Sequence, residues 1–190
     1  MKKVNVLVLG LVVAMGLSSC IKDGETFDQA AQYELEKPII EEYANEKLSN
    51  PEFSEEWGIW FEILDPGETD SYEYKIVGNS IEAPRIAVRY TGRLVPDGTQ
   101  FDENNSDAGW ETSLASTILG WHYTFLPKEI DGESVRGLTQ EGLQVGSRIR
   151  VVIPSYLAYG NQAREKIPAN TPLDFEIEVL AIASPSGAAN

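Results

Sequence analysis

Hydrophobic and polar residues alternate in several short stretches between Trp57 and the end of the chain. A period of two is typical of β-strands that bury one face and expose the other, and it predicts an antiparallel sheet. Turn-forming residues at 65–67 and 96–98 follow two of these regions. The alternating hydrophobic positions are Ile59, Phe61 and Ile63; Tyr72, Tyr74 and Ile76; Ile86, Val88 and Tyr90; Ile149, Val151 and Ile153; and Phe175, Ile177 and Val179.

Two other segments have a helical pattern. In residues 28–49 hydrophobic positions recur at roughly helical spacing, and the acidic residues between them, Glu36 among them, are expected to form a solvated face. Pro38 is expected to break or restart this helix because it lacks a backbone N–H. Residues Glu141–Val145 predict a second, short helix that ends at Gly146. Together the helices and the antiparallel strands predict the α+β class.

The first residues resemble the signal peptide of a bacterial lipoprotein. Lys2-Lys3 precedes a hydrophobic run over residues 4–17, which is shorter than the about 20 residues that a membrane-spanning helix needs. The run ends in Leu17-Ser18-Ser19-Cys20, which resembles a lipobox. We therefore expect cleavage before Cys20, lipid attachment to its thiol, and a cell-envelope protein held on a bacterial membrane, periplasmic or associated with the outer membrane. The alternative is an ordinary signal peptide in which Cys20 is incidental.

The composition excludes several kinds of function. A formal net charge of −15 repels nucleic acid and argues against a nucleic-acid partner. Cys20 is the only cysteine and His122 the only histidine, so the sequence predicts no intrachain disulfide, no cysteine-based metal site and no histidine-based triad. No glycine-rich phosphate loop occurs. We therefore expect neither a metal nor an organic cofactor.

Separated fragments in the second half of the chain carry a family resemblance. They are residues 88–92 (VRYTG), 98–102 (GTQFD), 158–160 (AYG), 167–170 (IPAN) and the alternating strand 173–179. In order and spacing they resemble the FKBP-type peptidyl-prolyl cis-trans isomerases. The resemblance implies an antiparallel sheet wrapped around one short helix, with a hydrophobic pocket between the two. It also implies an isomerase that helps exported proteins to fold and acts on proline-containing polypeptide clients.

Isomerisation about an X–Pro bond requires no nucleophile, metal or cofactor. Its barrier of about 18–20 kcal/mol comes from amide resonance, and uncatalysed exchange takes roughly tens to hundreds of seconds. A twisted amide has lost conjugation and is less dipolar than a planar one. A hydrophobic pocket that strips water from the prolyl ring and amide therefore favours the twisted form.

The resemblance assigns roles to particular residues. The catalytic group consists of Tyr90, Phe101, Asp102 and Tyr159, and the substrate-binding group of Ile118, Trp121, Ile167 and Phe175. Ile118 would offer its backbone N–H to the substrate, and the Tyr159 hydroxyl would hydrogen-bond a substrate carbonyl. Asp102 directly follows a hydrophobic residue and is expected to need a polar partner, for which Tyr90 is the candidate.

Two segments compete for the floor of the pocket. Ile118-Leu119-Gly120-Trp121 matches the family pattern and lies at the expected distance from Phe101, which places an insertion at about 122–140. Val135-Arg136-Gly137-Leu138 also matches and lies nearer to the predicted helix at 141–145, which would make Leu138 the floor. In either case an insertion lies beside the pocket, where it would act as a lid, a substrate-binding flap or a plug.

The sequence divides into a signal peptide (1–19), a tether with an acidic helical segment (20–56), an isomerase domain (57–183) and a disordered tail (184–190). The leading functional hypothesis is an isomerase, and the alternative is a lipoprotein of the same fold that binds clients or partners through an occluded pocket without isomerising them. A homodimer formed through the N-terminal helix is a further expectation.

Overall fold

The computed structural model describes residues 27–185, so the predicted signal peptide, Cys20 and most of the predicted tail lie outside it. The helices are α1 (Gln29–Lys47), α2 (Leu119–Phe125) and the 3-10 turns η1 (Leu114–Ser116) and η2 (Ser155–Leu157). The strands are β1 (Glu52–Ser54), β2 (Ile59–Asp65), β3 (Ile76–Val77), β4 (Ser80–Ile81), β5 (Arg85–Leu94), β6 (Gln100–Asn104), β7 (Trp110–Ser113), β8 (Glu129–Ile130), β9 (Glu133–Ser134), β10 (Arg148–Ile153) and β11 (Leu173–Ala183). No helix within residues 27–185 is long and hydrophobic enough to cross a membrane.

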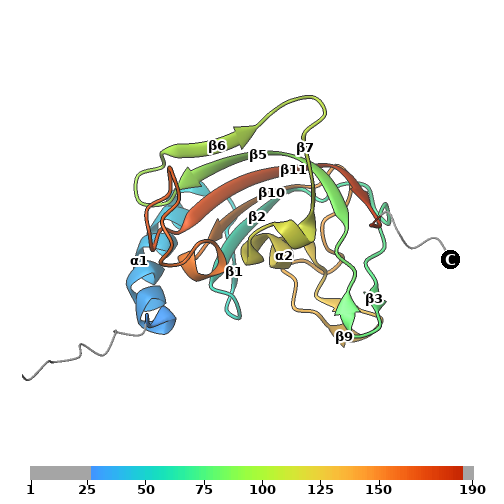
Figure 1. The fold of residues 1–190 in the computed structure, drawn as a ribbon, viewed down its shortest axis with the longest axis horizontal. Coiled ribbons are helices and arrows are strands. Elements are labelled where there is room, and N and C mark those ends of the chain that lie inside the picture. Colours follow the sequence, from blue (N-terminus) through green and yellow to red (C-terminus); the bar gives the residue numbers. More distant parts are fainter. Residues whose placement is uncertain (1–26, 186–190) are drawn as a thin grey trace, which may run out of the picture.

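One antiparallel sheet organises the molecule. Its strand order is β1-β2-β10-β11-β5-β6, and β7 pairs with the other end of β5. The sheet arches over α2 (Figure 1). Side chains that alternate along β2, β5, β10 and β11 fill the space between the sheet and α2. The α+β class predicted from the sequence is confirmed.

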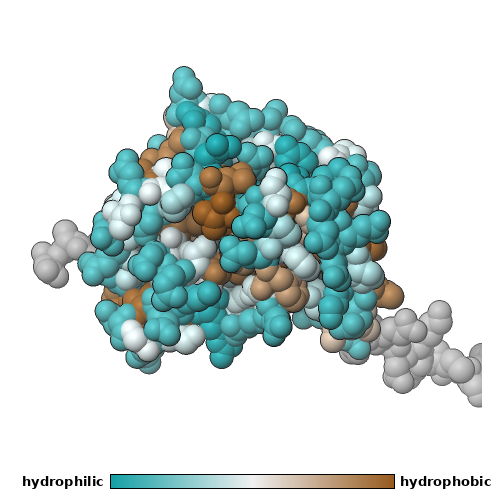
Figure 2. Space-filling view, turned by 180° about the vertical axis from the view of Figure 1, so that it is seen from behind, coloured by the Kyte–Doolittle hydropathy of each residue, from teal (hydrophilic) through white to brown (hydrophobic). Residues whose placement is uncertain are grey.

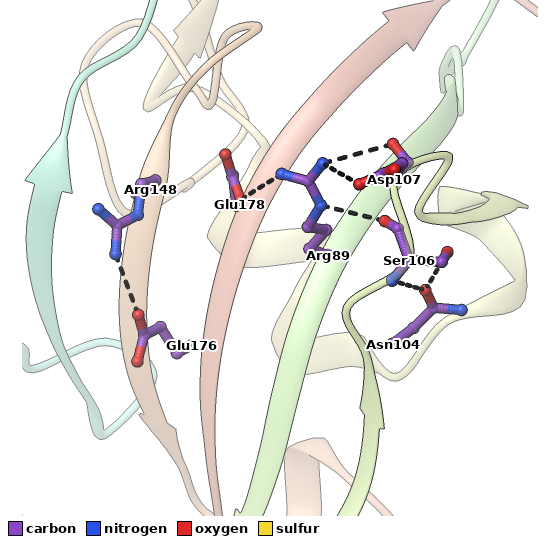
Figure 3. Close-up of polar contacts among 7 residues, drawn as sticks. All are labelled: Arg89, Asn104, Ser106, Asp107, Arg148, Glu176 and Glu178. Carbon is purple, nitrogen blue, oxygen red and sulfur yellow. Dashed lines mark hydrogen bonds and ion pairs between the residues drawn. The ribbon is translucent and has the colours of Figure 1, made fainter.

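The opposite face of the sheet carries charged residues and one helix. Arg89 lies 3.1 Å from Glu178, and Arg148 lies 3.2 Å from Glu176, as Figure 3 shows. Exposed pairs of this kind stabilise a fold by only about 0–1 kcal/mol each, so their main effect is to keep this face polar. Figure 2 shows one side of the molecule, where hydrophilic residues dominate and hydrophobic residues gather in a central patch.

The N-terminal segment is packed onto the sheet. Asp28 caps the N-terminus of helix α1, because its carboxylate accepts hydrogen bonds from the N–H groups of Ala30 and Ala31. Its residues Ile40 and Tyr43 pack with Val152 of β10, which faces away from α2. Strand β1 pairs with β2. The predicted segment 20–56 therefore contributes one helix and one edge strand to the sheet.

Three local predictions were wrong. Helix α1 continues through Pro38 because the packing of its buried face outweighs one missing hydrogen bond. Residues Glu141–Val145 are not helical: Gly142 has φ +71°, and the Leu143 N–H donates to the Phe125 carbonyl at 2.9 Å. The stretch 72–76 forms a strand only at its end, and Tyr74 instead packs in a small cluster of buried side chains with Leu126 and Ile130.

Candidate functional site

Aromatic side chains meet between the sheet and α2. The ring of Trp121 lies perpendicular to the ring of Phe175, with their centres 5.4 Å apart, and 5.6 Å from the ring of Tyr90. Phe101 of β6 packs edge-on against Phe175 at 5.6 Å. The structure thus brings together four predicted residues from β5, β6, α2 and β11. Leu138 is buried elsewhere in the core, and Trp121 occupies the floor position.

Two glycines allow this close packing. A Cβ atom on Gly120 would lie 2.5 Å from Cγ2 of Ile153, so glycine lets α2 approach β10 closely. A Cβ atom on Gly92 would lie 2.6 Å from the ring of Phe101. The glycines of both fragments, 88–92 and 118–121, are therefore required by contacts behind the pocket.

A carboxylate stands at the edge of the aromatic group. The Tyr90 hydroxyl donates a hydrogen bond of 2.7 Å to Oδ2 of Asp102, as the sequence suggested, and the backbone N–H of Glu103 donates to Oδ1 at 3.0 Å. Burial raises the pKa of the Tyr90 hydroxyl above its ordinary value, and the hydrogen bond to Asp102 raises it further. Tyr90 therefore stays protonated at neutral pH and remains a hydrogen-bond donor.

These residues line a cavity of about 600 Å³. Its walls consist of Tyr90, Phe101, Asp102, Trp110, Ser116, Thr117, Ile118, Leu119, Trp121, Ala158, Tyr159, Arg164 and Phe175. Seven of the predicted site residues are among them. The eighth, Ile167, is 5% exposed and belongs to the hydrophobic core that includes Phe101 and Phe175, and it does not line the cavity.

The cavity offers polar groups that have no partner inside the described chain. Ile118 precedes the first turn of α2, and within residues 27–185 its N–H donates no hydrogen bond. In the same residues the Tyr159 hydroxyl forms no hydrogen bond, and the guanidinium of Arg164 lies 5.2 Å above the Tyr159 ring. One backbone donor and one hydroxyl are thus available to hold a peptide across the aromatic floor.

Sequence reasoning missed several lining residues, of which Trp110 is the largest. It is 36% exposed, and its ring lies 5.7 Å from Tyr90 and 6.0 Å from Trp121. Trp110 reaches the pocket because β7 pairs with β5 so that Trp110 stands opposite Val88. The only signal in the sequence is a tryptophan just after Gly109 in a polar stretch, and this signal does not reveal the pairing.

The predicted insertion lies away from the cavity. Its first residues complete α2, and the remainder includes the β8–β9 hairpin. The indole N–H of Trp57 donates to the Arg136 carbonyl at 2.7 Å, and the Trp57 ring stacks on Tyr123 at 3.6 Å. None of residues 122–140 lines the cavity. The segment is therefore packed as part of the domain.

The sequence is similar to known peptidyl-prolyl cis-trans isomerases. The family model described as FKBP-type peptidyl-prolyl cis-trans isomerase matches residues 79–180. FkpA of Aeromonas hydrophila is 37% identical over 106 residues, which are 53% of this chain and 32% of that protein. FkpA of Buchnera aphidicola is 32% identical over 164 residues, which are 80% of this chain and 55% of that protein. The chain thus spans less than two thirds of these relatives.

Solved structures show the same fold. A peptidyl-prolyl cis-trans isomerase of Pseudomonas syringae superposes with a TM-score of 0.54 and 29% identity, over 85% of this chain and all of that one. FkpA of Escherichia coli superposes with a TM-score of 0.58 over 83% of this chain and 62% of that one. At 24% identity the second likeness concerns the fold alone.

Proposed function

The chain belongs to the family of FKBP-type peptidyl-prolyl cis-trans isomerases, and on that premise we propose that it catalyses rotation about X–Pro bonds in the cavity above Trp121. The observation that supports this most is the convergence of Tyr90, Phe101, Trp121 and Phe175 around one open cavity. Its clients are proline-containing polypeptides.

The walls suit the twisted amide more than the planar one. Phe101, Trp121 and Phe175 offer hydrocarbon surface that removes water from the prolyl ring, and a less dipolar amide loses less hydration there. The Ile118 N–H and the Tyr159 hydroxyl would hold flanking carbonyls in a turn. Asp102 fixes the Tyr90 ring through the 2.7 Å hydrogen bond and so keeps the wall in place. The role of Ile167 would be indirect, as part of the hydrophobic core that includes Phe101.

The alternative is a client-binding protein without turnover, whose insertion blocks the pocket. The open cavity of about 600 Å³, with none of residues 122–140 on its walls, favours catalysis over this alternative.

A protease-coupled assay on X–Pro peptides tests the proposal with the chain from Ile21 onward. We expect the folded protein to accelerate isomerisation, and Asp102→Ala and Phe101→Ala to reduce the gain. Arg136→Gln serves as the matched control because Arg136 follows the β8–β9 hairpin and does not line the cavity. Binding of peptides with no acceleration would favour the alternative.

We further propose that lipid on Cys20 holds the protein in the cell envelope. The Leu17–Cys20 motif and the preceding hydrophobic run support this. Palmitate labelling and membrane fractionation of the wild type and of Cys20→Ala test it: an equally labelled, equally membrane-bound variant would exclude the anchor.

Dimer formation through α1 is also a proposal. Leu35 is 69% exposed and Ile39 is 46% exposed, one helical turn apart. Light scattering at rising concentration tests this, and we expect Leu35→Glu to yield a monomer. A monomeric wild type at all concentrations would exclude it.

A further inference from the structure

Helix α1 lies on the face of the sheet opposite the cavity, yet it is bonded to the segment that carries Tyr159. Its partners in the core are Val152 and Val95, whereas the cavity lies on the side of Val151 and Phe175. Figure 1 shows α1 at one side of the sheet, separate from α2. A helix in that position can influence the pocket only through specific contacts with the elements that form its walls.

The main contact is a buried carboxylate. Glu36 of α1 is 2% exposed, contrary to the solvated face expected from the sequence. Its Oε2 accepts a hydrogen bond from the Ser155 N–H at 2.8 Å, and its Oε1 accepts one from the Ser155 hydroxyl at 2.5 Å. Gln32, one turn earlier in the helix, donates to Oε1 at 2.9 Å. A carboxylate hidden from water needs such donors, so the geometry around it is tightly fixed.

Ser155 connects Glu36 to the backbone on either side of Tyr159. Its carbonyl accepts hydrogen bonds from the Ala158 N–H at 2.9 Å and from the Gly160 N–H at 2.8 Å. The two donors flank Tyr159, which lines the cavity. All the hydrogen-bonding groups of Ser155 are therefore engaged, on one side with Glu36 and on the other with the backbone around Tyr159.

Aromatic contacts support the same junction. Tyr33 of α1 packs edge-on against Tyr156 at 5.5 Å, and the Tyr156 hydroxyl donates to the Trp57 carbonyl at 2.6 Å. Gly58 leaves room for Tyr33, because a Cβ atom at that position would lie 2.1 Å from the Tyr33 hydroxyl. Helix α1 thus contacts two successive residues of η2, which precedes Tyr159.

We propose that Glu36 is a positioning residue, which holds Ser155 so that the Tyr159 hydroxyl stands at the correct height over the cavity. Helix α1 is then part of the active unit, and the segment before the matched residues 79–180 is more than a spacer. The inference rests on the proposed function, since it concerns how well Tyr159 meets a bound X–Pro peptide.

The full chain carrying Glu36→Ala, Tyr159→Phe or both tests this by a double-mutant cycle on kcat/KM, at a temperature where each variant is folded. A misplaced contact group lowers catalysis by roughly tenfold or more, which is the expected loss for Glu36→Ala. If Glu36 acts through Tyr159, the double variant loses no more than Tyr159→Phe alone. Two losses that multiply would overturn the inference.

Two further variants keep the test decisive. Glu36→Gln retains a carbonyl oxygen for the Ser155 N–H and should recover most of the activity. If Glu36→Ala does not fold, Ser155→Ala removes only the hydroxyl bond, and it should show a smaller loss that again vanishes in the Tyr159→Phe background.

Tyr74→Phe is the matched control. It removes a buried hydrogen bond to the Leu143 carbonyl, 2.7 Å long, in a cluster that does not reach the cavity. Any fold-loss in kcat/KM that Tyr74→Phe causes should multiply with the fold-loss caused by Tyr159→Phe. An inactive wild type would refute the proposed function. An active wild type with a fully active Tyr159→Phe would refute only the role of Tyr159, and with it this inference.

Discussion

The contact between Gly120 and Ile153 gives a prediction that joins stability to activity. In Gly120→Ala the new methyl group would lie 2.5 Å from Cγ2 and 2.8 Å from Cδ1 of Ile153, which is fully buried. Alanine is about 1 kcal/mol more favourable than glycine inside a helix. Overpacking of a dense core costs about 1–3 kcal/mol. Because Ile153 is β-branched and has no exposed space to enter, we expect the steric cost to lie in the upper part of its range and to exceed the gain in helix propensity, so that the net loss of stability is up to about 2 kcal/mol.

Urea unfolding monitored by tryptophan fluorescence measures this loss. We expect a lower midpoint with an unchanged denaturant slope, and a lower kcat/KM, because α2 carries Trp121 and must move away from β10. In the double variant Gly120→Ala with Ile153→Ala, the side-chain atoms of Ile153 that would collide with the new methyl group are absent. The combined loss of stability should therefore be smaller than the sum of the single losses. A Gly120→Ala protein as stable as the wild type, or strictly additive losses, would refute the argument.

Three other substitutions test separate parts of the structure. Tyr90→Phe removes the hydrogen bond to Asp102, so kcat/KM should fall several-fold while urea unfolding shows a loss of at most about 1 kcal/mol. Tyr43→Phe leaves the fully buried Asp174 without one donor, and the free energy of unfolding should fall by about 1.5–3 kcal/mol; a change within error would contradict the importance of that contact. Burial lowers the pKa of His122 below 6.5, so the unfolded chain binds a proton before the folded one as the pH falls. The stability that this difference contributes is complete above about pH 6.5 and is lost below it. The free energy of unfolding of the wild type should therefore fall relative to that of His122→Asn as the pH is lowered from 7.5 to 5.5.

The sequence predicted the strands of the sheet well because alternation is a local signal. Ile59, Val88, Val151 and Ile177 all lie on its inner face. The short helix was misplaced for a local reason as well: α2 has no side-chain cap at Ile118. Its seven residues are too few to show a helical period.

The features that the sequence did not predict depend on contacts between segments far apart in the chain. Trp110 enters the cavity only because β7 pairs with β5. Glu36 looked like one of several solvated acids, since nothing near it in the sequence marks Ser155 as its partner. Contacts between distant segments therefore place Trp110 in the cavity and bury the carboxylate of Glu36.

The most direct test of the central claim is two-dimensional exchange NMR of an X–Pro peptide mixed with protein labelled at its tryptophan indoles. Trp121→Phe would assign the Trp121 signal. If the cavity above Trp121 catalyses isomerisation, we expect exchange cross-peaks between the cis and trans peptide, together with a shift of the Trp121 indole that follows the peptide concentration. A shift without exchange would mean binding without catalysis, and exchange without a shift at Trp121 would place the reaction elsewhere. Either result would show that the cavity above Trp121 is not the site of catalysis.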